Sequence, residues 1–251
     1  MDMAELMYIV GTLLILPAIL FALIAQFKVS SAFNHYGNIS SAVGMTGAQL
    51  ARSMLDENGC THVTVERTRG HLSDHYDPRK RVVRLSDEVY NSTSLAAVGV
   101  AAHEVGHAIQ HQQRYIPLIL RQIVIKSTSL VNKLLMPLII IGLIASIFVT
   151  GTTIMGMASE DFWFALIIAF CALYMISFVI NLITLPTEYN ASARAKRLLK
   201  NGNYVFDEEE YHGVSKVLNA AALTYLAGLM VSLAYMLRFL GLLLQMTGRR
   251  R

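Results

Sequence analysis

Long apolar segments constrain the fold of this chain more than any other feature of its sequence. A helix needs about 20 residues to cross a bilayer, and three segments approach or exceed that length: Tyr8 to Phe27, Leu134 to Val149 and Phe162 to Leu185. A fourth apolar stretch, from Leu218 to Leu244, contains Arg238, and an arginine at the bilayer centre costs about 2.5–3.5 kcal/mol. Charged residues make up only 15% of the chain. The sequence therefore predicts a mainly α-helical integral membrane protein with three to four transmembrane helices.

The basic residues predict how the chain is oriented. The segment 28–133 holds twelve Lys or Arg residues, the segment 188–216 holds five, and the residues before the first apolar segment include none. Because Lys and Arg are enriched in cytoplasmic loops, both basic segments are expected in the cytosol, with the chain crossing the membrane several times. The basic residues cluster beside apolar segments, which favours the lipid bilayer as a partner and argues against nucleic acid.

The same pattern divides the chain into five parts. Residues 1–27 are predicted to form an N-terminal transmembrane anchor, residues 28–133 a cytosolic domain, and residues 134–187 a transmembrane helical hairpin. Residues 188–216 form a second cytosolic segment in this interpretation. Residues 217–251 form a hydrophobic C-terminal helix that is either transmembrane or interfacial.

The segment 28–133 has the pattern of a small α+β domain. Thr46 is a suitable N-cap for a helix that ends near Asn58. Polar and apolar residues alternate from His62 to Glu66, which predicts a half-buried strand. A second strand is expected from Lys80 to Leu85, and the two are expected to form a short β-hairpin. The next helix is predicted from about Leu95 to Gln112, after a run of hydroxyl residues that can cap it.

This last helix contains the pattern H-E-x-x-H, formed by His103, Glu104 and His107. Histidines at positions i and i+4 project from one helix face, so both imidazoles can bind a single zinc ion. Zinc lowers the pKa of bound water to about 7, and Glu104 is placed to take a proton from that water and pass it to the leaving amine. Apolar residues flank the motif, and burying these polar groups without partners would be costly, which favours a metal site.

A catalytic zinc ion usually has three protein ligands, and the third does not lie within the motif. Glu188 opens the second basic segment, on the predicted side of His103 and His107, just after Pro186. We therefore predict one zinc ion per chain with Glu188 as the third ligand. The alternative for Glu188 is a favourable interaction with a helix dipole. His111 lies one turn beyond His107, too far along a straight helix to share the ion easily.

The group that stabilises the oxyanion is the least constrained part of the predicted site. His75 and Tyr76 are the predicted candidates because they belong to a dense polar cluster just before the second strand. His212 is a further candidate, and an ordinary turn or surface role is the alternative for all three. The strand Lys80–Leu85 is either an edge strand that pairs with an extended substrate or an ordinary hairpin strand.

Three stretches carry a family resemblance: Leu72–Pro78, Val100–His111 and Leu185–Ser192. With them, nearly the whole chain resembles the YugP-type neutral zinc metallopeptidases of bacterial membranes. The resemblance implies zinc on both motif histidines and the motif glutamate as general base. The chain is also distantly similar to HtpX-type membrane proteases, whose third ligand is the Glu of an E-x-x-A-D pattern. Ser192 stands where those proteases carry Asp, which leaves open how a zinc histidine is oriented here.

Two other functions compete with this interpretation. A site-2-type intramembrane protease would place H-E-x-x-H in a long apolar helix, but only the eight apolar residues 95–102 precede the motif. A non-catalytic membrane scaffold would keep zinc for structure, but structural sites usually close the fourth position with Cys or His. We therefore predict a gluzincin-like zinc endopeptidase with a zincin-like cytosolic domain, acting on protein substrates, membrane proteins included, at the membrane surface.

Overall fold

The computed structural model describes residues 1–123, 133, 137 and 160–249. The predicted span Leu134–Val149 lies, apart from residue 137, outside the described residues. The chain divides into two compact units. The first comprises Met1–Ala22, Arg121–Leu182 and Leu226–Arg251, and the second comprises Leu23–Leu120 and Ile183–Tyr225.

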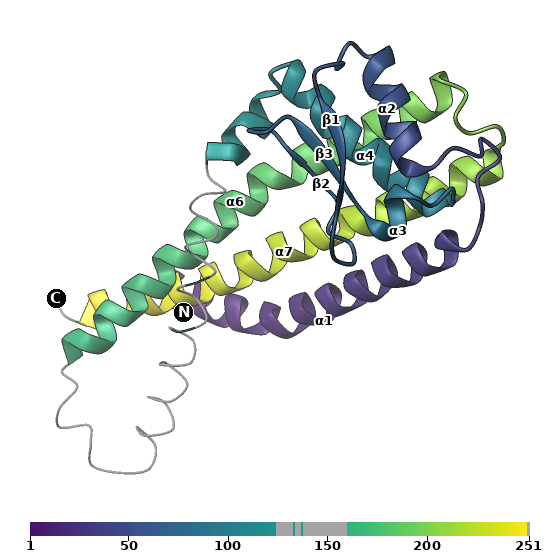
Figure 1. Ribbon diagram of the computed structural model, residues 1–251. Helices are drawn as coiled ribbons and strands as arrows, with labels where there is room; N and C mark the ends of the chain where they lie inside the picture. Colours follow the sequence, from purple (N-terminus) through teal and green to yellow (C-terminus); the bar gives the residue numbers. More distant parts are fainter. Residues whose placement is uncertain (124–132, 134–136, 138–159, 250–251) are drawn as a thin grey trace. The chain divides into compact units, whose positions relative to one another are not determined.

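Helices dominate the described residues, and a small sheet accompanies them (Figure 1). The long helices are α1 (Met3–Gly37), α6 (Glu160–Asn201) and α7 (Glu208–Arg249). The shorter helices are α2 (Gly47–Glu57), α3 (Asp87–Tyr90) and α4 (Leu95–Gln112). The strands are β1 (Thr64–Thr68), β2 (His75–Asp77) and β3 (Val82–Ser86).

Three of the described helices are long and apolar enough to cross a membrane: Met3–Gly37, Leu166–Asn201 and Glu208–Gly248. They contain the predicted first and fourth apolar stretches and, from Leu166 on, the third. The chain is thus a mainly helical membrane protein with a small sheet-containing domain, as the sequence predicts.

Within the first unit, α1 and α7 approach each other closely enough for their backbones to touch. A Cβ atom on Gly11 would lie 2.4 Å from the backbone nitrogen of Arg238, and one on Gly241 would lie 2.5 Å from the backbone nitrogen of Tyr8. Small residues permit such contacts between membrane helices, where van der Waals packing is the main source of association. The arginine that interrupts the C-terminal apolar stretch therefore lies at a helix–helix contact.

The second unit has a core formed by α2, α4 and the sheet. Thr46 caps α2: its hydroxyl accepts a hydrogen bond from the backbone N–H of Gln49, whose side chain returns one to the Thr46 backbone. The apolar face of α2 is fully buried, and Leu50, Met54 and Leu55 pack in one core with residues of α4 and β3. The predicted N-cap of this helix is confirmed.

The sheet differs from the predicted hairpin. Its strand order is β1-β3-β2, with β3 parallel to β1 and antiparallel to β2. The two predicted strands are therefore parallel neighbours, and the antiparallel partner of β3 is the short strand His75–Asp77. The interpretation of Lys80–Leu85 as an edge strand for substrate is wrong, because both edges of β3 are already paired. The edge strands of this sheet are β1 and β2.

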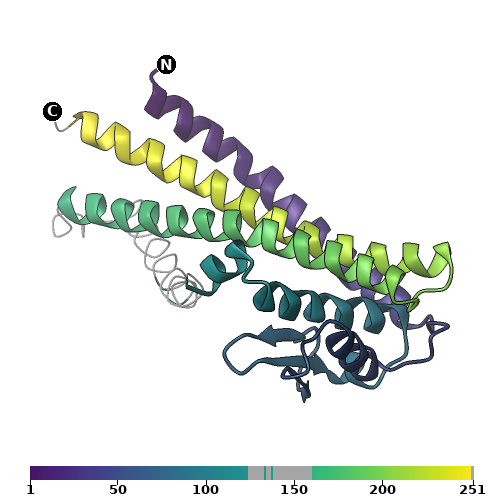
Figure 2. The ribbon, with the colours of Figure 1, turned by 90° about the horizontal axis from the view of Figure 1, so that it is seen from above.

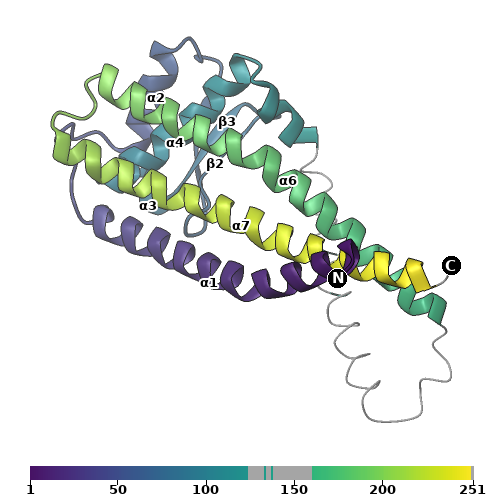
Figure 3. The ribbon, with the colours of Figure 1, turned by 180° about the vertical axis from the view of Figure 1, so that it is seen from behind.

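The helix α4 has the predicted bounds, and its first turn is capped by the hydroxyl of Ser94, which accepts from the backbone N–H of Ala97. One side of α4 packs on α2 and the sheet. Figure 2 shows that the C-terminal part of α6 runs alongside another side of α4, and Figure 3 shows the same pairing from behind. This pairing places the motif between the domain core and α6.

Candidate metal centre

The helix α4 presents the motif to α6 along one face. His103, Gly106, His107 and Gln110 follow each other at intervals of three, one and three residues, which places them on one side of an α-helix. Each of them contacts α6 or lies against its backbone. The pairing of these two helices therefore assembles the site.

Gly106 allows the two helices to come this close. A Cβ atom at this position would lie 2.7 Å from the backbone carbonyl oxygen of Ala191. No side chain of ordinary size fits without a shift of the α6 backbone. Gly106, the third residue between the motif histidines, is therefore needed for the close packing of α4 on α6.

Three ligand atoms converge at this helix pair. Oε2 of Glu188 lies 3.1 Å from Nε2 of His103 and 3.5 Å from Nε2 of His107. Tetrahedral zinc with bonds of about 2.0–2.1 Å places its ligand atoms about 3.3–3.4 Å apart, so the spacing fits this ion. Glu188 is only 1% exposed, and both histidines are largely buried. Within the described residues, these three form the single His/Cys/Asp/Glu group of metal-binding dimensions.

The hydrogen bonds of Gln110 determine which nitrogen of His107 carries its proton. The Gln110 amide nitrogen donates to the carbonyl oxygen of Thr187 and to Oδ1 of Asn190, both at 2.9 Å. Its oxygen therefore faces Nδ1 of His107, 3.0 Å away, and can only accept. The proton lies on Nδ1, which leaves the Nε2 lone pair directed toward Glu188 and available to a metal ion.

His103 has a comparable partner on α6. Its Nδ1 lies 3.1 Å from the hydroxyl oxygen of Ser192. This ring nitrogen of His103 thus has a neutral hydroxyl as its partner.

Glu104 and its neighbour His103 both line a cavity. The cavity has a volume of about 260 Å³, and both residues line it together with Asp74 and Tyr225. Glu104 is itself 7% exposed. Burial raises the pKa of the Asp74 carboxyl, although this group accepts hydrogen bonds from the backbone and hydroxyl of Ser86. Glu104 therefore borders a cavity next to the ligand cluster.

The remaining predicted residues have other contacts. The Tyr76 hydroxyl lies 2.8 Å from Nδ1 of His111. Burial raises the pKa of Tyr76 to about 12 and lowers the pKa of His111, so the phenol donates to a neutral imidazole. His75 is exposed, with Nδ1 2.8 Å from the Ser73 carbonyl oxygen, and His212 is exposed.

Two residues of the site were not anticipated from the sequence. Gln110 shares the motif face of α4, one turn beyond His107, and this spacing was a usable signal. Tyr225 lies far along the chain on α7, and no local pattern connects it to the motif. Its place at the Glu104 cavity depends on how α7 packs in the second unit.

Comparisons with known proteins agree with this geometry. Residues 11–244 match the model of the family described as "Putative neutral zinc metallopeptidase". The chain is 43% identical over 217 residues to a Bacillus subtilis (strain 168) protein named "Putative membrane protease YugP". The alignment covers 86% of this chain and 88% of that relative. No solved structure matches the chain significantly.

The family match extends across the motif helix, the segment that carries Glu188 and most of the three long apolar helices. Both the family description and the name of the relative denote peptidases. The chain therefore belongs to this family of neutral zinc metallopeptidases.

Proposed function

We propose that the chain is an endopeptidase that holds one zinc ion on His103, His107 and Glu188 and hydrolyses peptide bonds of protein substrates at the membrane surface. The observation that supports this most strongly is the convergence of two Nε2 atoms and one carboxylate oxygen beside Glu104. A structural zinc site needs four protein ligands. A three-ligand cluster next to a carboxylate that lines a cavity has the composition of a hydrolytic centre.

Each side chain has a defined task in this proposal. The carboxylate of Glu104 accepts a proton from the attacking water and returns it to the leaving amine. Zinc, when bound, supplies Lewis-acid polarisation of the scissile carbonyl and lowers the pKa of the water. Gln110 and Ser192 hold the two imidazoles in the orientation and tautomer that leave Nε2 free for the metal.

The oxyanion donor is proposed among the polar groups near Glu104. Tyr225 is added to the sequence candidates His75 and Tyr76, because it lines the same cavity as Glu104. A phenol can donate one hydrogen bond to the developing negative charge. The Tyr76 hydroxyl would first have to leave His111, with which it is paired.

The distribution of basic residues supports a cytosolic site. We propose that residues 28–133 and 188–216 face the cytosol of a bacterial cell and that residues 1–27 anchor the chain in the inner membrane. In this division, residues 134–187 form a transmembrane helical hairpin, and residues 217–251 form a hydrophobic C-terminal helix that is either transmembrane or interfacial. Peptide bonds near the cytosolic membrane surface, including those of membrane proteins, are then the accessible substrates.

The competing functions fit these observations less well. In a site-2-type protease the motif helix would itself lie in the membrane, whereas α4 packs on α2 and the sheet in one core. A metal-binding scaffold has no need for an acidic residue on a cavity beside the ligands. The scaffold remains a defined outcome of the experiment below.

The decisive experiment compares Glu104→Gln with the wild-type protein purified in detergent. We expect about one zinc ion per chain in both proteins and cleavage of an unstructured protein such as casein only by the wild type. A general base contributes about 10²–10⁴-fold to the rate. A chelator should abolish wild-type activity, and added zinc should restore it.

Glu66→Gln is the matched control, since it removes an exposed carboxylate on β1. It should leave both zinc content and cleavage unchanged. Equal cleavage by the wild type and Glu104→Gln would contradict the assigned base. Bound zinc without any cleavage of peptides or proteins would favour the scaffold.

A further inference from the structure

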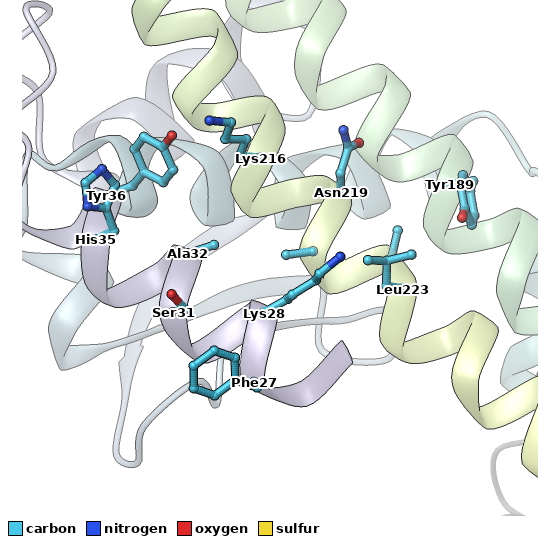
Figure 4. A pocket seen from close by; sticks show the side chains of 12 residues that line it. Phe27, Lys28, Ser31, Ala32, His35, Tyr36, Tyr189, Lys216, Asn219 and Leu223 are labelled. Atoms are coloured by element: carbon cyan, nitrogen blue, oxygen red, sulfur yellow. The ribbon is translucent and has the colours of Figure 1, made fainter. Parts of the chain in front are cut away.

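A second and larger cavity lies in the same unit, away from the metal ligands. It has a volume of about 670 Å³ and is lined by side chains of α1, α6 and α7 (Figure 4). Apolar groups make up much of the lining, among them Phe27 and Leu223. Tyr189, which is 47% exposed, lies at the α6 side.

The polar groups of this cavity are cationic or neutral. Lys28 and Lys216 belong to its lining, and the twelve described residues that line it include no acid (Figure 4). Asn219 adds a donor: its amide oxygen accepts from Lys196 at 2.7 Å, so its NH₂ group remains for a ligand. The lining of the cavity thus combines apolar side chains with groups that attract an anion.

The cavity-lining residues lie where each helix changes from apolar to polar. In α1, Phe27 ends the apolar stretch and Lys28 follows it directly. In α7, Lys216 comes two residues before the apolar stretch begins at Leu218. In α6, Tyr189 follows soon after the apolar stretch ends. Lysine and tyrosine at such boundaries are typical of the level of lipid headgroups.

We propose that this cavity binds one anionic phospholipid of the adjoining leaflet. Its phosphate lies between Lys28 and Lys216, and the start of an acyl chain lies against Phe27 and Leu223. Basic pockets between membrane helices are known to select anionic headgroups. The apolar lining adds hydrophobic contact that a soluble phosphate cannot use.

A phospholipid fits these features better than an acidic substrate peptide. All three helices bring their apolar-to-polar boundaries to the cavity, and a lipid has its own boundary at the same depth. The metal ligands do not line this cavity, whereas α7 also contributes Tyr225 to the separate cavity that holds Glu104. Lipid binding here therefore needs neither zinc nor peptidase activity.

Native mass spectrometry of the whole protein in a non-ionic detergent tests this proposal. Phosphatidylglycerol and phosphatidylcholine with identical chains are titrated against the wild type, Lys28→Gln, Lys216→Gln and the double variant. A lysine near an anionic lipid surface contributes roughly fivefold in affinity. We expect preferential phosphatidylglycerol adducts on the wild type, roughly fivefold weaker on each single variant and roughly thirtyfold weaker on the double variant.

Lys80→Gln removes the same charge from the exposed β2–β3 turn and should bind phosphatidylglycerol as the wild type does. Retained zinc in every variant shows that the unit has folded. Equal binding of the two lipids, or full phosphatidylglycerol binding by the double variant, would overturn the proposal. Complete displacement of the lipid by glycerol phosphate or by an acidic peptide would instead assign the cavity to a soluble anion or a substrate.

Discussion

Oε1 of Gln110 lies 3.0 Å from Nδ1 of His107, and the amide nitrogen of the same Gln110 is held by two oxygens of α6. The Gln110 side chain therefore links the orientation of the His107 ring to α6, the helix that carries Glu188. Partners of this kind typically contribute 10–100-fold to metal affinity.

Replacing Gln110 with leucine removes the acceptor for the His107 proton and the amide that donates to Thr187 and Asn190 of α6. We expect zinc affinity to fall about 10–100-fold, measured by competition with a fluorescent chelator. Gln112→Leu is the control, because Gln112 is on the same helix but bonds to Gly59 and Cys60. Equal zinc affinity in Gln110→Leu and the wild type would show that the amide does not orient the ligand.

Replacing Gly106 with alanine forces α6 away from α4, because the new Cβ atom would meet the Ala191 carbonyl oxygen at 2.7 Å. Glu188 moves with its helix, so zinc content should fall sharply while the two histidines remain in place. Gly99→Ala serves for comparison: its Cβ would lie 3.3 Å from the side chain of Val214 and 3.9 Å from the Val214 carbonyl oxygen. Normal zinc content in Gly106→Ala would mean that α6 can shift without losing the site.

Replacing Ser192 with aspartate restores the pattern of the HtpX-type proteases. A carboxylate that accepts from Nδ1 of His103 raises the basicity of the ring, so zinc should bind more tightly than in the wild type. Ser192→Ala removes the contact and should bind zinc about tenfold more weakly. Isothermal titration of both variants measures the difference, and the opposite order of affinities would contradict the assigned role.

Replacing Tyr225 with phenylalanine removes only a hydroxyl from the cavity of Glu104. If this phenol stabilises the oxyanion, kcat should fall about 10²–10³-fold with little change in KM or zinc content. Tyr76→Phe, measured in parallel, tests the candidate suggested by the sequence. An unchanged kcat in Tyr225→Phe together with a reduced kcat in Tyr76→Phe would reverse the assignment.

Replacing Glu210 with alanine affects stability instead of catalysis. Its carboxylate is buried and accepts from the backbone N–H groups of Ala42, at 2.6 Å, and Phe206, at 3.0 Å. Each hydrogen bond of this kind contributes about 0.5–1.5 kcal/mol, so the melting temperature in detergent should fall. Glu209→Ala removes an exposed neighbour in the same helical turn and should melt like the wild type.

The elements with strong local signals were predictable from the sequence. Thr46 with Gln49 forms the expected cap of α2, and α4 has the expected bounds. The sheet was harder because His75–Asp77 is only three residues long and polar, so its pairing with β3 leaves no periodic pattern. The parallel pairing of β1 and β3 depends on that inserted strand.

Some residues of the candidate site could likewise be predicted from the sequence, and others could not. Spacing in the motif and the order of apolar segments sufficed to select His103, His107 and Glu188, which the structure brings together. The contacts of Gln110 depend on the register between α4 and α6, and the place of Tyr225 depends on the packing of α7. These registers depend on side-chain packing along whole helices, and local patterns in one sequence do not reveal that packing.

His103 and Glu188 are 85 positions apart, and an apolar segment of the chain is translated between them. Translation proceeds from the N-terminus, so the ribosome completes the motif helix well before it adds the third ligand. A growing chain therefore has two of its three ligands and no finished centre while its own later segments are inserted. In the proposed function, hydrolytic capacity therefore arises only once the segment that carries Glu188 has been added to the chain.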